Sequence, residues 1–149
     1  MAVALQPDGR IVVAGQTQNA LFQSQVLIVR FEPNGDVDTS FGSSGEVTPA
    51  RGVANDVAVQ PDGKIVVAGD IFPDSAFVAR FNTDGTPDTS FQGGGTFVFA
   101  NSALGSDFIE NVTLANDGGI VAIGSSNVIF NDTETIGQLL LMKLFEVCE

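Results

Sequence analysis

Apolar residues in this chain gather in short runs that are separated by turns rich in proline, aspartate and glycine. Residues 3–6, apolar except for Gln6, and residues 11–14 are two such runs, and they flank the turn Pro7-Asp8-Gly9. Proline fixes φ at the first corner of a tight turn, and glycine takes the positive φ that closes it. The pattern predicts a β-hairpin that ends at Gly15, with its second strand covered on both faces because its apolar run is unbroken.

A second hairpin is expected after a polar loop at residues 16–25. Its strands are residues 26–31 and 37–41, joined by a turn at 32–36 that contains Pro33 and Gly35. One unit of the chain therefore holds four strands.

The same unit recurs along the chain. The segment from Gln6 to Gly15 is repeated from Gln60 to Gly69 with one change, Arg10 to Lys64. A more divergent copy runs from Ala115 to Gly124. The offsets of 54 and 55 residues indicate a repeat protein with a period near 55. We expect one domain over residues 1–149, divided into units 1–55, 56–110 and an incomplete third unit, 111–149, that lacks its fourth strand.

The second hairpin is repeated as well. Residues 77–81 and 87–91 flank the turn 82–86, and Lys143 stands in the third unit where Arg30 and Arg80 stand in the others. Four-stranded antiparallel units in series are the plan of a β-propeller. The predicted fold is all-β, with about 2.7 blades of propeller type. Because closed propellers typically have 4–8 blades, three explanations stay open: a fragment of a longer chain, copies that assemble until the ring closes, or a short open stack.

The length differences between the units are confined to particular connections. The distance along the chain from the glycine expected to end the second strand to the basic residue of the third strand is 15, 11 and 19 residues in the three units. In an up-and-down unit these connections lie on the face opposite the two hairpin turns. Variable loops on a rigid scaffold are where binding usually occurs, so we expect binding through loops 16–25, 70–76 and 125–138.

Two segments carry a family resemblance. Residues 4–15 read ALQPDGRIVVAG and residues 78–91 read VARFNTDGTPDTSF, and both are followed by glycine-rich or variable stretches. They resemble a bacterial β-propeller repeat, the delta-60 repeat, a domain of unknown function. The resemblance is specific in the first two units and weak in the third, where Asn116 replaces the turn proline. It implies a propeller fold and a secreted or surface-attached setting, but no reaction.

The charge and composition of the chain limit the classes of partner that it is expected to bind. The net charge of −12 disfavours binding to nucleic acid or to an anionic membrane surface. Cys148 alone makes no disulfide framework, and no apolar run is long enough for a membrane span. No signal peptide is visible, which fits either a cytoplasmic protein or a piece of a longer exported one.

Several side chains invite a chemical interpretation. Arg30 with Asp38, and Arg80 with Asp88, are expected to form cross-strand ion pairs that lock the second hairpin, whereas Lys143 has no such partner. Catalysis by Thr39, Ser40, Thr89 or Ser90 is not expected, because a serine nucleophile needs a base and the chain has no histidine. Residues 36–40 alternate oxygen ligands as calcium loops do, but the second copy has Thr86 in place of Asp36.

Core packing is expected for the recurrent phenylalanines, Phe31, Phe41, Phe81, Phe91 and Phe145.

The leading prediction is a non-enzymatic repeat scaffold that binds protein or glycan, with no catalytic, metal or cofactor-binding residues. One alternative is an enzyme with a metal site in the central channel, of the calcium-dependent lactonase or lyase type. Its ligands would come from the innermost strands, which offer only Asp56, Asn111 and Met1 or Ala2. The other alternative is a purely structural spacer. Exposed aromatic side chains on the variable face would favour binding, and we expect Phe22 and Phe72 to be candidates.

Overall fold

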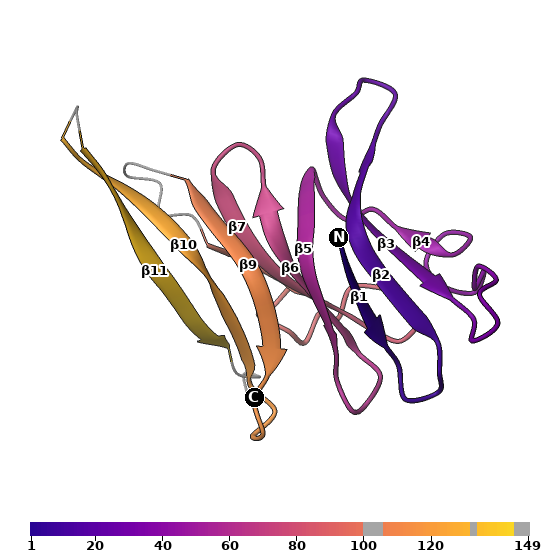
Figure 1. Cartoon of the computed structure of the whole chain (residues 1–149). Helices are drawn as coiled ribbons and strands as arrows, with labels where there is room; N and C mark the ends of the chain where they lie inside the picture. Colours follow the sequence, from indigo (N-terminus) through magenta and orange to yellow (C-terminus); the bar gives the residue numbers. More distant parts are fainter. Residues whose placement is uncertain (100–105, 132–133, 145–149) are drawn as a thin grey trace.

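The structure, a computed structural model that describes residues 1–99, 106–131 and 134–144, consists of three antiparallel sheets in chain order (Figure 1). The first sheet has the strand order β1 (Ala2–Leu5), β2 (Ile11–Gln18), β3 (Ser24–Phe31), β4 (Glu46–Val47). The second has the order β5 (Gly52–Val59), β6 (Ile65–Ile71), β7 (Ser75–Phe81), β8 (Thr96–Phe99). The third consists of β9 (Asp107–Leu114), β10 (Ile120–Asn131) and β11 (Glu134–Leu144). The predicted all-β fold with tandem propeller-type blades is confirmed.

The core lies between consecutive sheets rather than within one layer. Phe41, in the turn between β3 and β4, packs with Phe77 and Phe81 of the second sheet in one buried cluster. Phe91, between β7 and β8, packs with Ile109 and Ile120 of the third sheet in another. The predicted packing role is therefore confirmed for Phe41, Phe81 and Phe91; Phe31 is half-buried, and Phe145 and Cys148 lie outside the described residues. No helix in the described residues is long and apolar enough to cross a membrane.

The glycine expected to end the second strand lies inside it. β6 continues past Gly69 to Ile71, and β2 continues past Gly15 to Gln18. The register of β5 against β6 shifts between Ala54 and Asp56, and this bulge brings the β5 backbone close to Gly69. A Cβ at Gly69 would lie 2.0 Å from the carbonyl oxygen of Val53. Gly69 therefore serves close backbone approach at a bulge, as does Gly124, where a Cβ would lie 1.8 Å from the carbonyl oxygen of Phe108; at Gly15 the nearest atom is the Met1 side chain at 3.6 Å.

The fourth strand also differs from the prediction. Residues 37–41 and 87–91 form compact turns, and the outer strands β4 and β8 follow them at Glu46–Val47 and Thr96–Phe99. Only one bridge, between Phe31 and Val37, remains of the expected pairing in the first unit. The divisions expected at 55/56 and 110/111 fall inside β5 and β9, because these innermost strands begin at Gly52 and Asp107.

The connections of variable length are mostly strand. Of residues 16–25 only 19–23 form a turn, and of residues 70–76 only 72–74, because β2–β3 and β6–β7 are long hairpins. The third connection is a hairpin of β10 and β11, and residues 132–133 of it lie outside the described part. Figure 1 shows the β2–β3 and β6–β7 tips at one edge of the molecule and the β1–β2 and β5–β6 turns at the opposite edge.

Candidate functional site

The turn at the β1–β2 hairpin is built as the sequence predicts. Gly9 has φ 87°, and its amide donates to the carbonyl of Gln6 at 2.9 Å. The Asp8 carboxylate accepts a hydrogen bond from the Arg10 amide at 3.0 Å, which holds the turn from within. Asp62 and Asp117 accept in the same way from Lys64 and Gly119. These recurrent aspartates therefore serve turn geometry.

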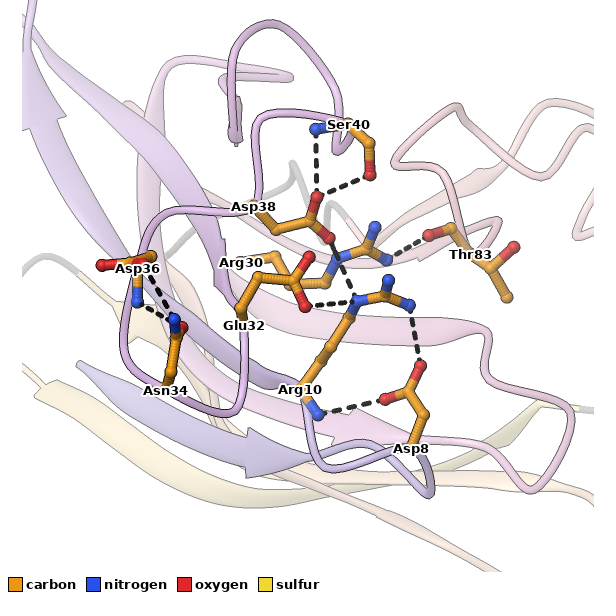
Figure 2. Close-up of polar contacts among 9 residues, drawn as sticks. All are labelled: Asp8, Arg10, Arg30, Glu32, Asn34, Asp36, Asp38, Ser40 and Thr83. Carbon is orange, nitrogen blue, oxygen red and sulfur yellow. Dashed lines mark hydrogen bonds and ion pairs between the residues drawn. The ribbon is translucent and has the colours of Figure 1, made fainter.

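A buried ion pair lies beside this turn in the first blade (Figure 2). Arg30 Nε lies 2.7 Å from Asp38 Oδ2, and both side chains are about 5% exposed or less. The other carboxylate oxygen accepts from the amide of Ser40 at 3.0 Å and from its hydroxyl at 2.5 Å. The Arg30 guanidinium also stands 4.6 Å from the centre of the Phe41 ring. All these groups are held in one geometry by their neighbours.

The same cluster recurs in the second blade. Arg80 Nε lies 2.7 Å from Asp88 Oδ2, and Ser90 donates to Oδ1 from its amide at 3.1 Å and from its hydroxyl at 2.7 Å. Lys64 Nζ adds a second cation 3.0 Å from Asp88, as Arg10 Nε does 3.3 Å from Asp38. The predicted pairs thus form, although they tie strand to turn rather than strand to strand. The only substitution in the repeated ten residues keeps the positive charge, a signal that could have located this second cation.

Both aspartates stay ionised at unusually low pH. The hydroxyl of Ser40, together with its amide and Arg30, lowers the pKa of Asp38 in spite of burial. Burial would raise the pKa of Asp88, but hydrogen bonds from Ser90 and Lys64 and the charge of Arg80 outweigh it, so this pKa lies well below its ordinary value of 3.8. A carboxylate fixed in this way holds structure and does not exchange a proton near neutral pH. The serines serve the same cluster as donors.

The clusters also join one blade to the next. Arg30 donates through Nη1 to the carbonyl of Thr83, which belongs to the β7–β8 turn of the second blade (Figure 2). The Gly42 amide donates to the carbonyl of Asp84 at 2.8 Å, and Gln6 Nε2 donates to the carbonyl of Gly63 at 3.2 Å. This role could not be predicted from the sequence, because the partners lie more than 40 residues away and are backbone oxygens.

The third blade departs from one expectation. Lys143 was expected to have no counterpart of Asp38, but its Nζ lies 2.6 Å from Asp117 Oδ2 in the β9–β10 turn. The turn aspartate thus replaces the missing fourth-strand carboxylate. This pair is much more exposed than those in the other two blades, with 39% and 55% of the side chains accessible.

The side chains considered for a channel metal site do not form one. Asp56 accepts through Oδ2 from the amide of Val112 at 2.8 Å and so binds the second blade to the third. Asn111 is exposed, and Met1 is 95% exposed. Asp38, in the calcium-like segment 36–40, has its carboxylate engaged in the ion pair with Arg30. Within the described residues, no three Asp, Glu, Cys or His side chains gather closely enough to hold a metal ion.

An open cleft of about 540 Å³ separates the turns of the first and second blades. It is lined mostly by polar residues, among them Asp8, Arg10, Asp62 and Asp84. Its carboxylates are hydrogen-bonded within their own turns, as Asp84 is to Thr86 at 2.9 Å. The cleft is therefore a seam between blades; among its lining atoms, Gln6 Oε1 is buried and has no hydrogen-bond partner in the part of the chain that the structure describes.

The tips of the long hairpins carry exposed apolar side chains. Leu21 is 75% exposed and Phe22 is 83% exposed at the β2–β3 tip, and Phe72 is 45% exposed at the β6–β7 tip. Asn19 Oδ1 accepts from the amides of Leu21 at 2.9 Å and Gln23 at 3.0 Å. Phe22 has φ 58°, a backbone conformation that bulky residues rarely adopt. The predicted exposure of Phe22 and Phe72 is confirmed.

Comparison with known proteins agrees with this architecture. A family model described as "Domain of unknown function (DUF5122) beta-propeller" matches residues 6–41 and 60–91. The two matches fall on the first and second blades and end at Phe41 and Phe91. A search of curated proteins returned no match for the chain. The family description does not use the narrower term delta-60 repeat, which stays a prediction from the sequence.

Proposed function

We propose that this β-propeller domain of unknown function, identified by its two matched repeats, is a non-enzymatic scaffold that binds a partner through its long hairpin tips. The observation that carries the proposal is the exposed pair Leu21 and Phe22, held outward by the Asn19 turn. Large exposed aromatic side chains on a rigid turn lose little conformational entropy on binding, which suits them to recognition.

Several features of the blades support binding rather than catalysis. The recurrent arginines, aspartates and serines are engaged in structural clusters, and the chain has no histidine to act as a base. Because the chain carries a net negative charge, it favours uncharged or basic partners. The resemblance of the repeats to exported bacterial chains supports an extracellular setting. The apolar character of the tips favours a protein partner over a glycan.

The test uses two defined probes, a random peptide library displayed on phage and an array of purified glycans. We expect peptides with apolar side chains to be enriched. The double variant Leu21→Ser, Phe22→Ser should weaken their binding at least about tenfold, since each buried side chain contributes about 1.5–3 kcal/mol. Val98→Ser, at a 49% exposed apolar position on β8, is the matched control and should bind as the wild type does.

Two results would count against the proposal. Enrichment of neither peptides nor glycans would favour the structural spacer. Enriched ligands that bind the tip variant as tightly as the wild type would place recognition elsewhere on the domain.

A further inference from the structure

One face of the first blade is apolar and uncovered. It consists of alternate side chains of three strands and is called here the open first face: Val3, Leu5, Ile11, Val13, Leu27, Val29 and Phe31. Val3 is 66% exposed and Leu5 is 71% exposed on the inner strand. Apolar surface that is continuous over three strands is uncommon on an isolated domain and marks an interaction site.

The repeat shows what covers this face elsewhere in the molecule. The equivalent side chains of the second blade are Val57, Val59, Ile65, Val67, Phe77, Ala79 and Phe81, and all of them pack in the cluster between the first and second blades. Val57 is 6% exposed, against 66% for Val3, and Ile65 is fully buried. The difference arises from the neighbouring blade and not from the side chains, which are nearly the same.

The covering surface is the opposite face of a blade. In the first blade it is formed by Val12, Ala14, Val26, Ile28 and Phe41. In the second blade the equivalent residues, Val66, Ala68, Ala76, Val78 and Phe91, cover the third blade. In the third blade the same positions are Val121, Ile123 and Leu141, which we call the open third face. Ile123 is 38% exposed and Leu141 is 65% exposed.

We propose that a second copy of this chain covers the open first face with its open third face. The chain forms this blade-to-blade contact twice internally, and its two open faces are the two halves of a third such contact. Since the halves differ, the association is head-to-tail, and each copy leaves one face for the next. Rings result if the rotation between copies closes, and longer arrays if it does not.

The polar edge of the contact is compatible with this arrangement. Arg30 is the residue whose guanidinium crosses from the first blade to the carbonyl of Thr83 in the second. Lys143 stands at the equivalent position of the third blade, where it pairs with the exposed Asp117. A cation is therefore present on the edge that would meet the β3–β4 turn of the next copy.

The experiment measures molar mass by light scattering on a sizing column over a range of concentrations. We expect the wild type to give multiples of 15.5 kDa that grow with concentration. Leu5→Ser on the first face and Leu141→Ser on the third should each reduce the association constant at least about tenfold. A mixture of the two variants should form a 1:1 dimer, because one intact face of each kind remains.

The mixture distinguishes this contact from others. A monomeric wild type at all concentrations would overturn the proposal, as would a mixture of the variants that stays monomeric. Self-association of Leu141→Ser but not of Leu5→Ser would overturn the head-to-tail contact in favour of two first faces. The tip variant Leu21→Ser, Phe22→Ser should associate as the wild type does, so the two surfaces are tested separately. If Leu5→Ser alters the circular dichroism spectrum, the nearly isosteric Val3→Thr replaces it.

Discussion

The substitution Asp88→Asn tests how the blades are held together. It keeps the size of the side chain and removes its charge, so that the buried Arg80, 1% exposed, loses the carboxylate that lies 2.7 Å from its Nε. The asparagine oxygen can still accept from Ser90, but its amide nitrogen then faces the two donors Arg80 and Lys64. Both the charge pair and the hydrogen-bond polarity of the site are lost.

The expected cost follows from burial. Removing one partner of a buried ion pair costs about 3–5 kcal/mol, because the remaining charge stays in a site from which water is excluded. For a chain of this size that corresponds to a decrease in melting temperature of roughly 6–20 °C. Asp62→Asn is the matched control: this side chain is 56% exposed and 3.9 Å from Lys64, and an exposed pair contributes only about 0–1 kcal/mol.

Urea unfolding followed by far-ultraviolet circular dichroism is the suitable assay, since the chain has no tryptophan or tyrosine for fluorescence. If the loss arises from removal of the carboxylate charge beside Arg80, the double variant Arg80→Met, Asp88→Asn should recover part of it. The reasoning would be refuted if Asp88→Asn cost no more than Asp62→Asn, or if the double variant were less stable by the sum of the two single losses.

Two further predictions concern stability. Gly69→Ala should cost about 1–3 kcal/mol or more in urea unfolding, because its Cβ would lie 2.0 Å from a backbone oxygen, whereas Gly94→Ala, with no atom within 4 Å, should change stability by less than about 0.5 kcal/mol. The depressed pKa of Asp88 means that its contribution is complete above the ordinary value of 3.8 and is lost as the pH falls below that value toward the folded-state pKa. Unfolding free energies measured between pH 2 and pH 6 should therefore decrease more steeply on the acid side for the wild type than for Asp88→Asn, and parallel curves would contradict this.

The fold could be predicted from the sequence because its signals are local and repeated. Pro7-Asp8-Gly9 encodes a turn by its own backbone preferences, and its second copy at 61–63 excludes coincidence. The ion pair of Arg30 and Asp38 was also predictable, since the residues are eight apart and recur at the same spacing. A single copy of either pattern would have left the strand and turn assignments ambiguous, and the repeat resolved them.

The parts that were predicted wrongly depend on side-chain and backbone contacts that the apolar pattern does not show. Residues 37–41 read as a strand, but Asp38 accepts from the amide of Ser40 two residues on and bends the chain into a turn. Gly69 read as a strand end, although its role depends on the bulge in β5. The long hairpin of residues 16–25 is polar in sequence, and only pairing of its arms makes it strand.

The contacts that cross from the first blade to the second have a consequence for synthesis of the chain. Gln6, Arg30 and Gly42 all donate to carbonyl oxygens of residues 63, 83 and 84. On a ribosome Arg30 Nε can pair with Asp38 within the first blade, but the Arg30 Nη1, Gln6 Nε2 and Gly42 amide donors have only water as a partner until the second blade has emerged. The first blade therefore cannot complete its native hydrogen bonds alone, and each blade of such an array is finished by the one translated after it.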